Sequence, residues 1–193
     1  MSLDELSNGI FTQEDWSAFY NSRSSMTDRE TVIRHAAVFE LILKRLITYK
    51  LNCPPDTPLE PDIAALFSGD GQFSTFAARI KECKRLGQID RDTRRDLEII
   101  KVLRNVFAHS PRELTLGTQE LETLCKDFRS REQTRYKGRF SRTIFDHVTE
   151  LLLTKLKHRW RVLYSEATGE PLEDKKAIFK YGVSVTLGSR SLI

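Results

Sequence analysis

Apolar residues recur at intervals of three and four along most of this 193-residue chain, which is the period of an amphipathic helix. The clearest case follows Thr27, where the capping box TDRE precedes an apolar face that predicts a helix to about Lys50. The sequence therefore predicts an all-α fold, built as a compact multihelical single domain. The same pattern predicts a short helix after residue 12 and helices over about 74–86, 91–109, 118–128 and 141–164.

Turn residues separate these predicted helices. Four prolines between 54 and 61 exclude a regular helix there, apart from one short turn near 63–67. Gly69-Asp70-Gly71 predicts a tight loop, Gly87 a helix C-cap and Asp90 an N-cap. The helix after Asp90 is expected to end near His109, because Pro111 disfavours the helical conformation at the preceding residue.

The chain changes character at about residue 168. The stretch FKYGVSVTL at 179–187 alternates apolar and polar residues, which favours a short strand. We therefore expect a helical domain over 1–167 and a C-terminal extension over 168–193. The strand could cover the helical core, pair across a dimer or add to the sheet of a partner protein.

Composition excludes several classes of protein. Basic residues number 31 and acidic residues 27, and this mild excess permits an anionic partner without requiring one. The three cysteines are widely separated and lack zinc-site spacing, so we expect reduced thiols, no metal and no cofactor in a cytoplasmic protein. No window approaches 18 uncharged apolar residues, and the acidic N-terminus does not resemble a signal peptide.

The segment KVLRNVFAHSPREL places Arg104, Asn105 and His109 where a helix is about to end. Arginine binds phosphate bidentately and histidine moves protons near neutral pH, so the three residues suit metal-independent RNA cleavage. Asn105 and His109 share a helix face, whereas Arg104 converges on His109 only if the helix stops before the histidine. Two such sets across a homodimer axis would supply both an acid and a base. The alternative is that these side chains cap the helix itself.

RNVFAH resembles the arginine–polar–histidine signature of the HEPN superfamily, an all-helical group that contains RNA-cleaving toxins and inactive binding members. A longer block, LFSGDGQFSTFAARIKECKRLGQIDRDTRRDLEIIKVLRNVFAH, is similar to the centre of the mannitol operon repressor family. This second resemblance covers roughly residues 30–110 and implies repression of a sugar-alcohol operon. The helix ending in LRNVFAH would be a poor recognition helix, so repression could also act through a protein partner.

A basic segment, KDFRSREQTRYKGRFSR, follows the predicted 118–128 helix. Arginines interleaved with aromatics suit phosphate contact and base stacking, while the alternative is a solvated connection whose aromatics pack inward. The residues predicted to bind nucleic acid or a protein partner are Lys126, Arg129, Arg131, Arg135, Tyr136, Lys137, Arg139 and Arg142.

Two functions follow as expectations. The first is a cytoplasmic, mannitol-repressor-like regulator that acts on gene expression through protein or nucleic-acid contacts. The second is a HEPN-type endoribonuclease that uses Arg104, Asn105 and His109. Burial of Arg104 and His109 in the core would exclude the nuclease, whereas an exposed cleft at a two-fold axis would favour it.

Overall fold

The computed structural model describes residues 13–22, 25–53, 59–133 and 140–169, with the backbone alone at 13–16. No strand occurs within these ranges, so the predicted all-α class is confirmed, while the predicted strand at 179–187 lies outside them. In chain order the elements are α2 (Gln13–Asn21), α3 (Asp28–Lys50), α4 (Pro61–Ala65), α5 (Phe76–Arg85), α6 (Arg91–His109), α7 (Gln119–Lys126), the 3-10 helix η2 (Arg129–Gln133) and α8 (Ser141–Thr168).

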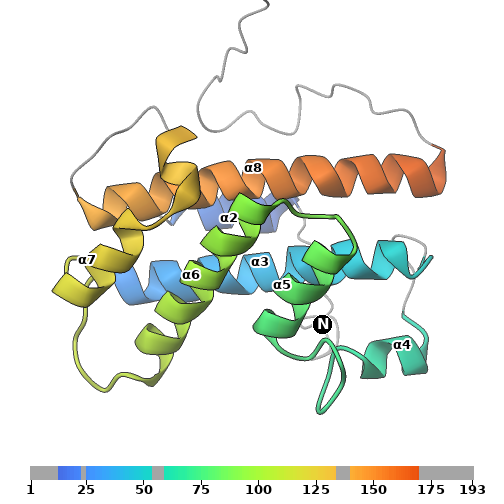
Figure 1. The fold of residues 1–193 in the computed structure, drawn as a ribbon, viewed down its shortest axis with the longest axis horizontal. Helices are drawn as coiled ribbons and strands as arrows, with labels where there is room; N and C mark the ends of the chain where they lie inside the picture. The colour runs from blue at the N-terminus through green and yellow to red at the C-terminus, as the bar shows by residue number, and fades with distance from the viewer. Residues whose placement is uncertain (1–12, 23–24, 54–58, 134–139, 170–193) are drawn as a thin grey trace, which may run out of the picture.

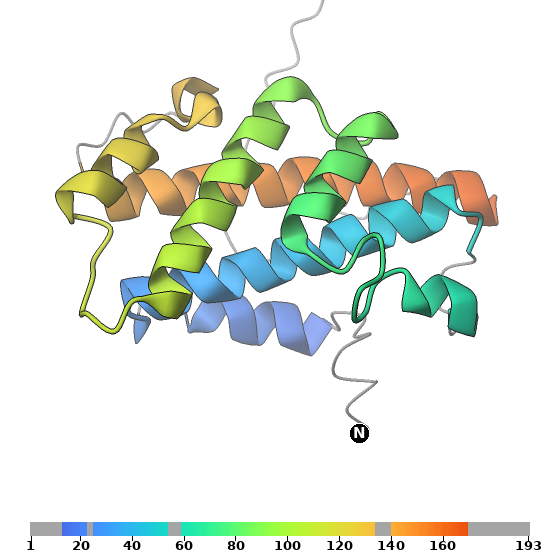
Figure 2. The ribbon, with the colours of Figure 1, turned by 60° about the horizontal axis from the view of Figure 1, so that its bottom comes forward.

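Helix α3 lies at the centre of the packing. It runs alongside α8, and α5 and α6 cross the pair on one side, as Figures 1 and 2 show. α7 and η2 cover the start of α8 next to α6 (Figure 1). Most apolar side chains of α3 that the sequence pattern placed inside are buried, among them Val32, Phe39, Leu43 and Ile47, whereas Ile33 and Ala37 are exposed. One continuous core therefore joins α3 to its neighbours.

Local capping fixes where the helices begin and end. Thr27 accepts a hydrogen bond from the Glu30 backbone N–H (3.2 Å) and donates its own N–H to the Glu30 carboxylate (2.8 Å), which confirms the predicted capping box. Asp90 accepts the Thr93 N–H at 2.6 Å at the start of α6. Gly87 has a φ of +68° after α5, as a helix C-cap requires.

Several boundaries differ from the prediction, and α5 begins at Phe76 rather than near residue 74. Pro61 occupies the first turn of α4, where a proline needs no N–H partner, so this helix begins two residues before the predicted turn. α8 continues beyond residue 164 to Thr168 and ends at Gly169, whose φ is +72°. The predicted 118–128 helix stops at Lys126, and a 3-10 turn that the sequence did not predict follows it.

The loop between α4 and α5 is held tightly against α3. Arg79 donates Nε to the Phe73 carbonyl (2.8 Å) and Nη1 to the Glu40 carbonyl (3.3 Å), which ties the loop to α3. A Cβ at Gly71 would overlap the backbone of Ala65 and Leu66, whereas one at Gly69 would meet nothing within 4 Å. The predicted glycine loop is therefore confirmed, with Gly71 required by close backbone approach.

Substitution at these two glycines should separate backbone crowding from backbone strain. Gly71→Ala should lower the free energy of unfolding by about 3 kcal/mol, because the backbone must move apart. Gly69→Ala should lower it by about 1 kcal/mol, the usual cost of a positive φ (+53° here) for a residue with a Cβ. Urea unfolding of both variants measures this, and an equal loss would contradict the account.

A buried lysine lies where α2 packs on α8. Lys157 is 8% exposed, and its Nζ donates to the Tyr20 hydroxyl at 3.2 Å and lies 5.3 Å from the centre of that ring. Burial lowers the pKa of Lys157 from 10.5 to about 8, although the charge of Glu150 opposes the shift. The folded protein therefore releases a proton that the unfolded chain keeps up to a higher pH.

This difference predicts a pH dependence of stability. Between about pH 8 and 10.5 the unfolded state binds more protons at Lys157 than the folded state, so stability rises with pH. The gain over this window should be on the order of 2 kcal/mol relative to a Lys157→Met variant, which lacks the titrating group. Urea unfolding at pH 7.5 and pH 10 measures the difference, and a wild type and variant that respond equally would contradict it.

Candidate functional site

Arg104, Asn105 and His109 lie on one unbroken helix. α6 stays regular to His109, and the N–H of its C-cap residue, Ser110, donates to the Val106 carbonyl at 2.9 Å. Five residues of regular helix turn a side chain by about 140° and advance it by about 7.5 Å. The helix therefore does not stop before His109, which was the condition for Arg104 and His109 to converge within one chain.

The Arg104 side chain turns toward α3 and α5. Its Nη2 lies 3.9 Å from Oε1 of Glu40, and its Nη1 donates to Oδ1 of Asn105 at 3.0 Å. The other oxygen of Glu40 lies 3.7 Å from Nη1 of Arg79. Glu40 is thus a shared counter-ion for two arginines, a role that its place in the middle of α3 gave no reason to predict.

All three motif residues are accessible to solvent. Asn105 and His109 are exposed, and the Arg104 side chain is 40% exposed. Burial in the core, which would have excluded an enzyme, is therefore not observed. Together, Glu40, Arg104, Asn105 and His109 form polar surface at the C-terminal half of α6, and they do not assemble a catalytic pair in one chain.

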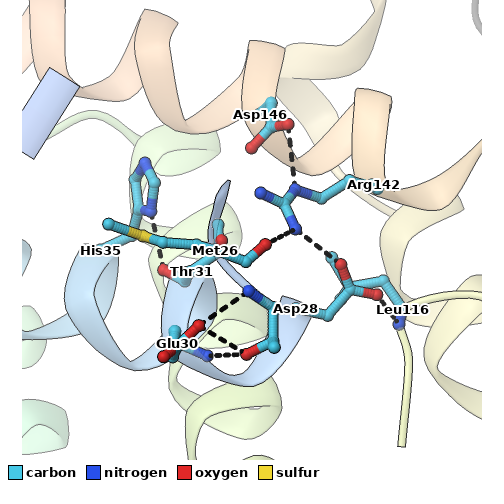
Figure 3. Close-up of polar contacts among 9 residues, drawn as sticks. Met26, Asp28, Glu30, Thr31, His35, Leu116, Arg142 and Asp146 are labelled. Carbon is cyan, nitrogen blue, oxygen red and sulfur yellow. Dashed lines mark hydrogen bonds and ion pairs between the residues drawn. The ribbon is translucent and has the colours of Figure 1, made fainter. Parts of the chain in front are cut away.

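The N-terminus of α3 fixes the segment that follows His109. Arg29 donates Nη2 to the carbonyls of Ser110 (2.9 Å) and Arg112 (3.1 Å). Asp28 accepts the Leu116 N–H at 2.7 Å through one oxygen and the Arg142 Nη1 at 2.7 Å through the other, as Figure 3 shows. The start of α3 therefore joins the loop after α6 to the start of α8.

The Arg142 side chain is engaged in contacts within the chain. Besides Asp28, its guanidinium donates to the Met26 carbonyl (3.3 Å) and to the Asp146 carboxylate (3.1 Å), contacts that are visible in Figure 3. Two carboxylates therefore neutralise the last residue of the predicted binding set.

The other members of that set lie in different places. Lys126 pairs with Glu122 at 2.6 Å, Arg129 is exposed and Arg131 is half-buried on η2. Phe128 is buried in the core, whereas Phe140 is 78% exposed. The remaining predicted residues, Arg135, Tyr136, Lys137 and Arg139, lie outside the described residues.

A buried carboxylate shapes the turn that carries Arg129. Asp96 on α6 is fully buried and accepts the backbone N–H groups of Arg129 (2.6 Å) and Ser130 (2.9 Å). Burial raises the pKa of Asp96, although these hydrogen bonds and the charge of Lys155 oppose the shift. Asp96 thus caps the start of η2 from 33 residues away, which explains why sequence periodicity missed the turn.

The described part of the chain holds no group of three or more His, Cys, Asp and Glu side chains that could bind a metal ion. Cys83 and Cys125 are buried, and burial raises the pKa of each thiol to about 12, so both are poor nucleophiles. Among the helices of the described ranges, none combines the length and apolar character needed to cross a membrane.

No protein-family model, curated protein or solved structure matches this chain, so function is inferred from the residues themselves.

The junction at Asp28 predicts a large loss of stability on its removal. Asp28→Ala should lower the free energy of unfolding by about 2 kcal/mol, because the Leu116 N–H and the Arg142 guanidinium lose their acceptor. Asp92→Ala is the matched control, since Asp92 also lies in the first turn of a helix but is exposed. Chemical unfolding of both variants tests this. Equal losses of unfolding free energy would show that Asp28 contributes no more than any acidic residue in the first turn of a helix.

Proposed function

We propose that this protein regulates gene expression by binding rather than by catalytic turnover, as its resemblance to the mannitol operon repressor family implies. The observation that carries the proposal is the direction of the motif side chains. Arg104 is turned toward Glu40, while His109 lies five residues later on the same regular helix.

Phosphodiester cleavage needs its participants at one phosphate. A base must reach the 2′-hydroxyl while a cation stabilises the charge that develops on the phosphorane. In one chain, Arg104 and His109 point about 140° apart, and Glu40 already neutralises part of the arginine charge. This geometry does not assemble a catalytic pair in one chain, which favours regulation by binding over turnover.

The endoribonuclease remains a second candidate because of one observation. His109 and Asn105 are exposed and the Arg104 side chain is 40% exposed, so RNA could reach all three. Two chains packed through the exposed side of α6 could then complete a catalytic set that one chain lacks.

RNA cleavage without divalent metal separates the two candidates. We expect wild type and His109→Ala to show the same background cleavage of structured and unstructured RNA, because no base and phosphate-binding pair is assembled. His158→Ala is the matched control, since His158 is exposed on α8, away from the motif. RNA cleavage that disappears in folded His109→Ala but persists in His158→Ala would contradict the proposal and support the endoribonuclease instead.

The proposed regulatory role is tested separately, by measuring transcript levels. Transcript levels in cells that lack the protein should change for a limited set of genes and return when either wild type or His109→Ala is supplied. A requirement for His109 in both this assay and the cleavage assay would contradict the proposal.

A further inference from the structure

Three short segments lie in a row along α8. These are η2, the first turn of α6 and the α5–α6 turn at residues 86–90, and the two views agree on their order (Figures 1 and 2). Two side chains of α8 reach them. Lys155 Nζ donates to Oε1 of Gln133 and Arg159 Nε donates to Oε1 of Gln88, each at 2.9 Å.

The cations along this row differ from those elsewhere on the described surface. Arg85, Arg94 and Lys126 each form an ion pair with a carboxylate on their own helix, at 2.6 to 2.8 Å. We call five cations on the three segments, the end of α5 and the facing part of α8 the α8 cationic row. Among the described residues, no carboxylate oxygen lies within 4 Å of any of these cations. The members of the row are Lys84, Arg91, Arg129, Lys155 and Arg159.

Nearby acidic groups offset part of this charge, because Asp90, Asp92 and Glu132 lie on the same three segments. From Leu151 to Ser165, α8 contains no aspartate or glutamate. Asp90 is already engaged by the Thr93 N–H, and the buried Asp96 by two backbone N–H groups of η2. Burial raises the pKa of Asp90, but the Thr93 hydrogen bonds and the charges of Lys155 and Lys84 outweigh it and leave that pKa lowered. The five cations outnumber these three surface carboxylates, so the row keeps a net positive charge at neutral pH and is partly exposed.

We infer that the α8 cationic row binds the phosphate backbone of duplex DNA. The inference rests on the proposed role in gene regulation and adds to it a surface and a partner. Lysines and arginines without local counter-ions gain most from phosphate contact, because binding releases condensed cations from the DNA. The surface would position the protein without reading the bases, which agrees with the expectation that the helix ending in LRNVFAH is a poor recognition helix.

The aromatic side chains near the row favour a duplex over a single strand. Single-strand binding relies on exposed aromatic rings on which bases stack. Phe128 is buried, and Trp160 is half-buried with its indole N–H donating to the Tyr49 hydroxyl at 2.9 Å. Neither ring is available as a stacking platform.

Fluorescence anisotropy with a labelled 20-base-pair duplex, measured over a range of salt concentrations, tests the inference. Wild type should bind with a Kd that weakens steeply as salt increases. Arg159→Gln should flatten the slope of log K against log salt by about 1, and the Lys155→Gln/Arg159→Gln double variant by about 2. Both variants lose a contact to a neutral glutamine amide, and the double variant also loses the Lys155 charge near Asp90 and Asp96, so thermal unfolding must show that both are folded.

Arg161→Gln provides the matched control. It removes the same charge from the same helix, but from a position about 200° further around α8. We expect its salt slope to equal that of the wild type.

Equal changes in the salt slope for Arg159→Gln and Arg161→Gln would overturn the inference, as would the absence of duplex DNA binding by wild type at low salt. Tighter binding of a single DNA strand of equal length, or of duplex RNA, would overturn it as well. If transcript levels still depend on the protein in any of these cases, the DNA surface fails while the regulatory role stands.

Discussion

The burial of α3 on several sides is the constraint on which the rest of the structure depends. A 23-residue helix whose buried residues include Val32, Phe39, Leu43 and Ile47 must be covered by more than one neighbour, and α5, α6 and α8 provide the cover. The polar side chains of α3 form hydrogen bonds and ion pairs with the surrounding elements. Asp28 holds the loop after α6 and the start of α8, and Glu40 lies between Arg79 and Arg104. The central helix therefore determines both the core and the surroundings of the RNVFAH motif.

The continuity of α6 decides what that motif can do. Because the helix persists to His109, its side chains follow helical geometry, and the arginine is drawn toward α3 by Glu40 rather than toward the histidine. The residue types required for RNA cleavage are present, yet one chain does not bring them to one point. Residue types alone left open a catalytic set or a helix cap, and the direction of Arg104 supports binding over turnover.

Most of the fold could be predicted because its signals are local. The Thr27 capping box, the Asp90 cap and Gly87 each act within four residues, and the helical period is visible in the sequence. What was missed depends on distant partners. Asp96 shapes η2 across 33 residues, and Asp28 reaches Leu116 across 88, so neither role leaves a local pattern. The α8 cationic row was missed for the same reason, since its members come from four separate elements.

Duplex DNA is expected to bind at the α8 cationic row, which is separate from Arg104 and His109. Nuclear magnetic resonance of the ¹⁵N-labelled protein, titrated with duplex DNA, measures this residue by residue. The account predicts that amide shifts concentrate in η2, the first turn of α6, the 86–90 turn and the facing part of α8. Shifts centred on residues 104–109 instead, or no shifts at low salt, would contradict it.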